Sequence, residues 1–384
     1  MRILIIASQV GKTAPGIVFE RLIKGLSLHY EIDVITSNYS PNINLDGLKK
    51  VSVIPLGLGN KYRAIERILT GFFNINIIDI IWSYRAKNRC FTQYELIFSF
   101  SSFHNLYSLI AGSKIASKQK IKHFAYFVDA IPSPNGWIPV NGYYRAVENI
   151  VSKHLSQVDG FFSANHKMLN YQLTTFTHKN NLRTGVIYNP SNSIITDKYE
   201  KKTKANYIFL YTGGIYGLRT PFYLIEAFKE VLKEYPNSIL MFVGTKLSEK
   251  YLENCTDNVR KQILIYPFTR DLSKFYNEAT ALIDIDANID NDVFLSSKIT
   301  NYIFVDRIII SITGKNSPSR EIFRNVPSIY QTNHNVDEIV WAMKSTIKES
   351  VNVDFNDRKG IQKKFSLESV VESIRHYIDN LDEK

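Results

Sequence analysis

The chain has 384 residues, of which 45% are hydrophobic and 22% charged, and its formal net charge at pH 7 is +11. This length accommodates two domains of ordinary size, and the composition excludes a disordered or fibrous chain. Cys90 and Cys255 are the only cysteines, and they lack the spacing of a disulfide framework or a zinc site. The cysteine content therefore predicts a reducing, cytoplasmic environment.

The chain begins with alternating apolar strands and helices. The run RILIIA at residues 2–7 precedes a loop with Pro15 and Gly16, the helical pattern IVFERLIKGLSL, and the strand EIDVITSNY at residues 31–39. This order is a βαβ unit, which predicts a parallel sheet with right-handed crossovers. Further strands are predicted at residues 51–56, 95–100, 122–128, 160–164 and 185–189.

The segment from Lys61 to Arg89 interleaves Arg and Lys with Phe, Ile and Trp at helical spacing. One interpretation places it on an anionic membrane surface, and the other makes it a core helix with a basic outer face. Neither a signal peptide nor a spanning helix is predicted, because the longest apolar runs fall short of roughly 20 residues. The protein is therefore expected to be soluble or peripheral.

The excess positive charge lies in the first half. Residues 1–190 contain 21 Lys and Arg against 10 Asp and Glu, whereas residues 191–384 contain 26 of each. A solvated surface, contact with anionic lipid and binding of a phosphorylated substrate remain open as explanations. No helix-turn-helix, zinc or RNA-binding motif accompanies the charge, so nucleic acid is not an expected partner.

A polar linker, SNSIITDKYEKKTKAN, follows Pro190, and the strand–helix alternation then restarts. The second half predicts strands at residues 207–213, 238–244, 262–268, 281–286, 307–313 and 328–331. It predicts helices at residues 219–236, 247–260, 271–279, 294–304, 317–324 and 335–349. The tail at residues 365–381 predicts an amphipathic helix capped by Ser366.

This pattern predicts an α/β fold of two Rossmann-like, doubly wound domains that face a cleft. The expected divisions are an acceptor-binding domain at residues 1–190, a nucleotide-sugar-binding domain at 191–365, and a helix at 366–384 that packs back on the first domain. In such sheets ligands bind beyond the carboxyl ends of the strands. Residues that directly follow strands are therefore the candidates for chemistry.

The stretch YTGGIYGLRTP places two glycines after a strand and an arginine at the start of the next helix. Gly213 and Gly214 would let a ligand approach backbone N–H groups, and Arg219 could pair with phosphate oxygens. Together they predict a diphosphate cradle, although a glycine turn with a surface arginine also explains them. The G-x-G-x-x-G and P-loop signatures are absent at this strand–helix junction.

A second group follows the strand ALIDID. Ser296, Ser297 and Lys298 open a helix whose N-terminal amides and lysine charge favour an anion. The alternative is that Ser296 only caps the helix and Lys298 is solvated.

Three segments of residues 207–325 follow one another in the chain: YTGGIYGLRTPFYLIEAF, ILIYPFTRDLSKFYNEATALIDID and FLSSKITNYIFVDRIIISIT. Their order resembles the donor-binding lobe of retaining GT-B glycosyltransferases, and the first half of the chain resembles that family more weakly. The resemblance implies a nucleoside-diphosphate sugar in the second lobe, an acceptor in the first, and no essential metal or other cofactor. Arg219 and Lys298 match the family's diphosphate-binding basic residues, whereas Gly214 replaces a second basic residue of many members. The family's paired glutamates are replaced by Asn301 and by Val293 beside Asp292.

The resemblance also assigns roles to the remaining candidates. Phe268 and Thr269, with Arg270, lie in the loop expected to bind the base, and Gly16 lies in the glycine loop of the first lobe. Asp129, after the strand KHFAYFV, is expected to contact the reacting centre or to cap a turn. We expect Asp292, Ser296, Ser297, Asn301 and Glu321 on the donor and His104 on the acceptor.

These features predict a hexosyltransferase of bacterial surface-polysaccharide assembly. It would use a nucleotide-sugar donor and a glycan or lipid-linked glycan acceptor at the cytoplasmic face of the membrane, with catalysis assigned to Asp129, Arg219 and Lys298. The alternatives are a noncatalytic GT-B subunit that binds a nucleotide sugar, and a nucleotide-sugar epimerase.

Overall fold

The computed structural model describes residues 1–56, 60–73, 76–90, 92–102, 105–134, 137, 142–191, 206–269, 271–349 and 353–380. The chain divides into two compact units. One unit consists of Met1–Pro190 with Leu367–Lys384, and the other of Ser191–Ser366. His104, Arg270 and most of the predicted linker fall outside the described residues.

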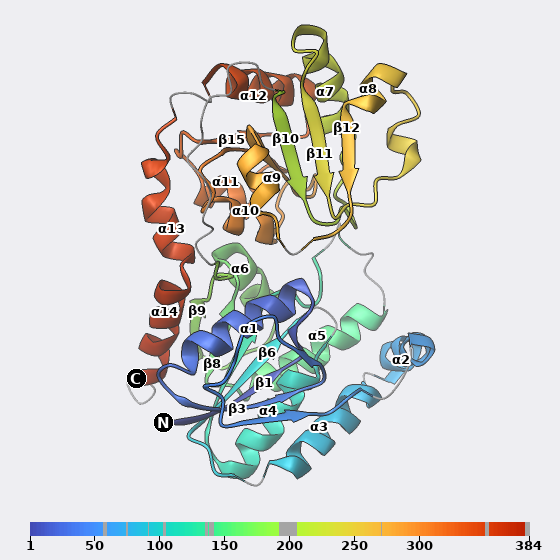
Figure 1. Ribbon diagram of the computed structural model, residues 1–384. Helices are drawn as coiled ribbons and strands as arrows, with labels where there is room; N and C mark the ends of the chain where they lie inside the picture. Colours follow the sequence, from blue (N-terminus) through green and yellow to red (C-terminus); the bar gives the residue numbers. More distant parts are fainter. Residues whose placement is uncertain are drawn as a thin grey trace. The chain divides into compact units, whose positions relative to one another are not determined.

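The first unit is built on a seven-stranded parallel sheet with strand order β5-β3-β1-β6-β7-β8-β9 (Figure 1). Its strands are β1 (Arg2–Ala7), β3 (Glu31–Thr36), β5 (Lys50–Val53), β6 (Leu96–Ser101), β7 (Lys122–Phe127), β8 (Gly160–Ser163) and β9 (Arg183–Val186). A separate pair joins β2 (Val10–Gly11) to β4 (Tyr39–Ser40). Its helices are α1 (Ala14–Leu26), α2 (Asn60–Phe73), α3 (Ile77–Arg89), α4 (Tyr107–Gln119), α5 (Gly142–Leu155) and α6 (His166–Thr175).

Helices cover both faces of this sheet, because successive strand side chains point to opposite faces. Ile97 of β6 belongs to an apolar cluster with Trp82 of α3 and Tyr107 of α4. On the opposite face, Phe100 of β6 contacts Phe19 of α1, with 5.4 Å between the ring centroids.

The C-terminal helix α14 (Leu367–Asp379) completes the first unit. Its Tyr377 ring lies 4.8 Å from that of Phe162 in β8, and Val371 lies directly beside Gly25 of α1. The hydroxyl of Tyr30 also donates a hydrogen bond of 2.7 Å to Asp379. The helix thus shares the α1 side of the sheet.

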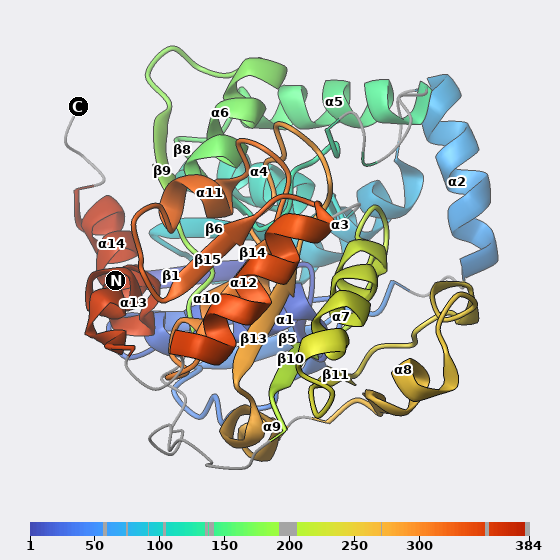
Figure 2. The same ribbon diagram turned by 90° about the horizontal axis from the view of Figure 1, so that it is seen from above.

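The second unit contains a six-stranded parallel sheet with order β12-β11-β10-β13-β14-β15. Its strands are β10 (Ile208–Thr212), β11 (Ile239–Val243), β12 (Ile263–Tyr266), β13 (Ala281–Ile285), β14 (Ile308–Ile312) and β15 (Ile329–Thr332). Its helices are α7 (Phe222–Glu234), α8 (Asp257–Lys261), α9 (Ser273–Glu278), α10 (Ser297–Tyr302), α11 (Pro318–Ile322), α12 (Val336–Glu349) and α13 (Lys359–Phe365), with 3-10 turns at Glu249–Tyr251 and Phe355–Arg358. Helices α7 and α12 lie side by side (Figure 2).

The predicted fold class is confirmed, and the differences are local. The helix expected at residues 247–260 is wrong, because only the turn Glu249–Tyr251 and the short α8 form there. The helix α13 was not predicted. The segment from Lys61 to Arg89 forms two helices, α2 and α3, instead of one. Trp82 of α3 is buried, whereas Ile81 is 52% exposed, so this segment contributes both to the core and to the surface.

Candidate functional site

The second sheet has its topological switch point between β10 and β13. From this point the chain order runs outward to β12 on one side and to β15 on the other. Ligands of open parallel sheets bind at such a point, beyond the carboxyl ends of the strands. Gly213 directly follows β10 and Asp286 directly follows β13, so the predicted glycine pair lies at the expected edge.

Arg219 is held by a carboxylate that the sequence analysis did not consider. Its Nη2 lies 2.9 Å and its Nε 3.2 Å from Oδ1 of Asp286, and Arg219 as a whole is only 8% exposed. Burial by itself lowers the pKa of Arg219, but the charge of Asp286 outweighs it and the pKa is raised. Asp286 therefore neutralises the guanidinium, and the alternative of a surface arginine is wrong, because Arg219 is buried.

Lys298 of α10 lies in the same cluster. Its Nζ is 5.2 Å from the centroid of the Tyr211 ring, and its Cε is 3.5 Å from the position that a Cβ on Gly213 would occupy. Burial, followed by the charge of Arg219, lowers the pKa of Lys298 to about 8, although Asp284 and Asp286 oppose the shift. Lys298 is therefore close to the glycine turn and to three charged groups.

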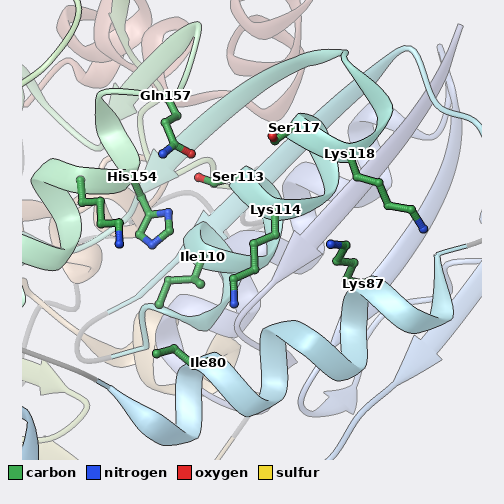
Figure 3. A pocket seen from close by; sticks show the side chains of 10 residues that line it. Ile80, Lys87, Ile110, Ser113, Lys114, Ser117, Lys118, His154 and Gln157 are labelled. Carbon is green, nitrogen blue, oxygen red and sulfur yellow. The ribbon is translucent and has the colours of Figure 1, made fainter.

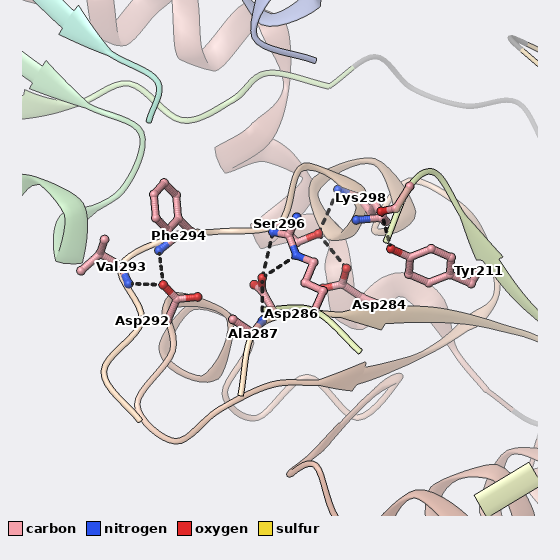
Figure 4. Close-up of polar contacts among 11 residues, drawn as sticks. Tyr211, Asp284, Asp286, Ala287, Asp292, Val293, Phe294, Ser296 and Lys298 are labelled. Atoms are coloured by element: carbon pink, nitrogen blue, oxygen red, sulfur yellow. Dashed lines mark hydrogen bonds and ion pairs between the residues drawn. The ribbon is translucent and has the colours of Figure 1, made fainter. Parts of the chain in front are cut away.

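Asp284 is the fourth charged member of this group. It is buried and accepts a hydrogen bond of 2.7 Å from the hydroxyl of Ser296. Burial, reinforced by the charge of Asp286, raises the pKa of Asp284 to about 6 against the opposing charge of Lys298. Figure 4 shows Asp284, Asp286, Ser296 and Lys298 gathered beside Tyr211. We call Arg219, Asp284, Asp286 and Lys298 the charge cluster.

The two glycines differ in the use of their backbone. Gly213 has φ +92°, and its N–H donates to the carbonyl of Val243 at 2.7 Å, so this amide is not available to a phosphate. Gly214 is exposed, and only its carbonyl is engaged, by the hydroxyl of Tyr211. Among the described residues the Gly214 N–H has no partner. Gly214 is therefore the better backbone donor of the pair.

The residues around the start of α10 are tied to the protein. Ser296 is the N-cap and accepts from the Lys298 N–H, which confirms the capping part of the alternative, but its hydroxyl also donates to Asp284. Asn301 donates to the carbonyl of Ser297 and accepts from the hydroxyl of Ser191, both at 2.6 Å. Asp292 is buried and accepts from the amides of the two residues that follow it. Asn301 thus stabilises the beginning of the second unit.

Phe268 lies near the glycine turn and is 75% exposed. Its Cδ2 is 3.5 Å from the position of a Cβ on Gly244, and that position is 3.7 Å from Cα of Gly213. The neighbouring Thr269 donates to the carbonyl of Asp271. The Phe268 ring is therefore adjacent to the switch point and open to solvent. Glu321, the other predicted donor residue of this unit, is exposed on α11.

In the first unit, Gly16 serves packing. A Cβ at this position would lie 2.0 Å from the carbonyl oxygen of Gly11, so glycine is required for the start of α1 to approach that turn. This neighbour leaves no space for a ligand at the Cβ position of Gly16. Asp129 is partly buried just beyond the carboxyl end of β7, and its charge contributes to the raised pKa of Tyr126 after burial.

Two polar groups were missed by the sequence analysis. The first is the pair Asp284 and Asp286. In the sequence these two carboxylates interrupt an apolar strand, in the motif LIDID, and this interruption could have indicated a functional pair. The second lies at the switch point between β1 and β6, where the hydroxyls of Ser8 and Ser102 are 2.9 Å apart and Asn105 donates to Ser102 at 3.1 Å. No sequence spacing brings these serines together.

Within the described ranges, no group of three or more His, Cys, Asp or Glu side chains is arranged to hold a metal ion. No helix among these described residues is both long and apolar enough to cross a membrane.

Neither a protein-family model nor a curated protein matches this sequence. The fold, in contrast, is similar to solved glycosyltransferases. HepE of Anabaena, in complex with UDP, has a TM-score of 0.69 at 12% identity over 99% of this chain and 100% of that one. A glycosyltransferase from Rickettsia africae has a TM-score of 0.67 at 11% identity, with 100% and 99% covered.

The lipopolysaccharide outer core galactosyltransferase WaaB has a TM-score of 0.65 at 11% identity, with 99% of each chain covered. These structural neighbours are GT-B glycosyltransferases. The two-sheet α/β fold of this chain is therefore the GT-B fold that the sequence resemblance predicted.

Proposed function

We propose that this protein is a retaining glycosyltransferase that transfers a hexose from a nucleoside-diphosphate sugar to a glycan or lipid-linked glycan in bacterial surface-polysaccharide assembly. The observation that carries the proposal is the charge cluster at the switch point, where Lys298 lies over Gly213. The similar HepE structure contains UDP, and WaaB is named as a lipopolysaccharide galactosyltransferase. The bound UDP supports a nucleoside-diphosphate sugar as the proposed donor, and the name of WaaB supports the proposed pathway of surface-polysaccharide assembly.

Lys298 is the proposed cation for the leaving diphosphate. Its ammonium and the open N–H of Gly214 would stabilise the negative charge that develops on the diphosphate when the bond between the sugar and the diphosphate breaks. Arg219 is neutralised by Asp286, so its main proposed role is to hold the loop after β10 in place. The Lys298 cation would make a metal ion unnecessary for stabilising the leaving diphosphate.

Phe268 is the proposed platform for the nucleotide base, because an exposed aromatic ring offers a face for stacking. Asp129 is the proposed polar group at the reacting centre, where a carboxylate could accept the acceptor proton or stabilise positive charge on the sugar. His104 remains a proposed acceptor residue.

We also propose a cytoplasmic location with peripheral contact to an anionic membrane. Helices α2 and α3 expose several large apolar side chains, among them Ile68, Phe72, Phe73, Ile81 and Tyr84. Such side chains beside the basic residues of the same segment suit a membrane surface.

Purified full-length protein mixed with UDP-, GDP- and ADP-sugars tests the donor assignment. A thermal shift with one base identifies the donor, and release of nucleoside diphosphate in the presence of EDTA tests metal-independent turnover. Binding without hydrolysis or transfer would instead indicate the noncatalytic subunit. Conversion of UDP-GlcNAc alone into an epimer would indicate the epimerase.

A further inference from the structure

A cavity of about 530 Å³ lies in the helical layer of the first unit, lined by residues of α3, α4 and the C-terminal end of α5. Its lining includes Lys87, Lys114, Lys118 and Lys153, together with His154. No carboxylate is present among the lining residues that the structure describes. This cavity belongs to the first unit, whereas the charge cluster belongs to the second.

In the part of the chain that the structure describes, no carboxylate neutralises the lysines of this cavity. No ion pair found within the described ranges involves any of the four. Lys114 donates a hydrogen bond of 3.0 Å to the hydroxyl of Ser83. Burial, then the charges of Lys87 and Lys153, lower the pKa of Lys114. Like charges held together in this way destabilise one another until an anion binds between them.

A buried hydroxyl provides an independent observation. Ser113 of α4 is only 3% exposed, and its Oγ has no hydrogen-bond partner among the described residues. The Nδ1 atom of His154 is also buried without a partner in that part of the chain. Figure 3 shows Ser113, His154 and Gln157 facing the same space, with Lys87 and Lys114 nearby and Lys118 pointing away. Buried polar atoms without partners are rare, because each costs free energy.

We propose that this cavity is a binding site for a phosphate ester. Lys87, Lys114 and Lys153 supply the charge, and the hydroxyl of Ser113 donates to a phosphate oxygen. The volume exceeds what a bare phosphate ion occupies, and Ile80 and Ile110 offer an apolar wall for the organic part of the ester. A soluble sugar or glycerol phosphate and a lipid headgroup share this chemistry. The proposal does not depend on the donor site.

The soluble source is tested by nuclear magnetic resonance on full-length protein that carries ¹³C-labelled histidine. Glycerol 1-phosphate is added at constant ionic strength, and the His154 ring signal is assigned by its loss in His154→Gln. We expect a saturable shift of that signal. The Lys87→Ser/Lys114→Ser variant should weaken binding by about tenfold or more, because charge-assisted contacts are lost.

The lipid source is tested by co-sedimentation with phosphatidylcholine vesicles that contain about one third phosphatidylglycerol, an anionic phosphodiester. The matched control is Lys24→Ser/Lys49→Ser, which removes the same charge from the same unit at positions that do not line the cavity. Ser113→Ala keeps the charge and removes only the buried hydroxyl. It should weaken binding several-fold without loss of stability, so a folding defect in the lysine variant would leave the test intact.

A saturable shift with glycerol phosphate supports the site and identifies its ligand as a soluble phosphate ester. Vesicle binding that the cavity variants lose and the control retains supports the site and identifies its ligand as a lipid headgroup. The proposal is overturned if neither probe binds. It is also overturned if the control loses as much binding as the cavity variants, since the effect would then be one of net charge.

Discussion

Arg219 and Asp286 form a buried ion pair in which Nη2 and Oδ1 are 2.9 Å apart. The pair joins the loop after β10 to the residue after β13, the two strands that flank the switch point. The ion pair holds the Arg219 guanidinium at this edge of the sheet, and the Asp286 carboxylate neutralises most of its positive charge. Lys298 is left as the cation whose protonation responds to its surroundings.

Removing one partner of the ion pair should destabilise the protein more than removing both. Arg219→Met leaves the buried Asp286 carboxylate without its ion-pair partner, a loss of about 3–5 kcal/mol in the free energy of unfolding. Arg219→Met/Asp286→Leu should recover most of this stability, because it leaves no unpaired charge. Urea unfolding of the two variants measures the difference, and equal stability of the two would show that the pair is not buried as described.

Binding of a nucleotide sugar should be coupled to uptake of protons. The pKa values of Lys298 and Asp284, about 8 and about 6, are both expected to rise when a diphosphate lies beside them. Above about pH 6 for Asp284, and above about pH 8 for Lys298, the bound protein then holds more protons than the free protein, so affinity falls as pH rises. Calorimetric titrations in buffers of different ionisation enthalpy measure the number of protons taken up.

Two variants separate these contributions. Lys298→Arg keeps the cation but does not titrate in this range, so the decline of affinity above pH 8 should disappear. Asp284→Asn should remove the proton uptake nearer pH 6. Unchanged proton uptake in both variants would place the titrating groups elsewhere.

Phe268→Ala should weaken nucleotide binding with little effect on stability, because the ring is 75% exposed. Loss of one base-stacking contact costs about 1–3 kcal/mol, or roughly five- to 150-fold in affinity. Trp341→Ala is a suitable control, since this aromatic side chain is 59% exposed on α12. Comparable affinities for the wild-type and Phe268→Ala proteins, measured by calorimetry, would remove Phe268 from the base site.

The glycine turn permits a comparison between neighbours. Gly213→Ala places a Cβ at φ +92°, and such a left-handed conformation costs about 1–2 kcal/mol for an L-residue. Gly214→Ala should be nearly neutral, because its φ is not in that region and the nearest side-chain atom to the new Cβ, on Tyr216, is 3.7 Å away. Thermal unfolding of both variants checks the order, which would be wrong if Gly214→Ala were the less stable.

Much of the fold could be predicted because buried parallel strands appear as short apolar runs between helical patterns. The glycine pair after β10 could be predicted for the same reason, since strand ends determine the binding edge. The pairing of Arg219 with Asp286 could not, because it joins positions 67 residues apart through strand order. Likewise, the capping role of Ser296 was foreseen, whereas the hydrogen bond of Asn301 to Ser191 depends on tertiary contact.

Calorimetric titration of wild-type and Lys298→Ala proteins with the nucleotide sugar that gives the largest thermal shift is the most direct test of the diphosphate site. The account predicts one binding site per chain and a loss of more than about tenfold in affinity, the effect of removing a charge-assisted hydrogen bond. Equal affinities in the two proteins, or no binding of any UDP-, GDP- or ADP-sugar to the wild type, would contradict it.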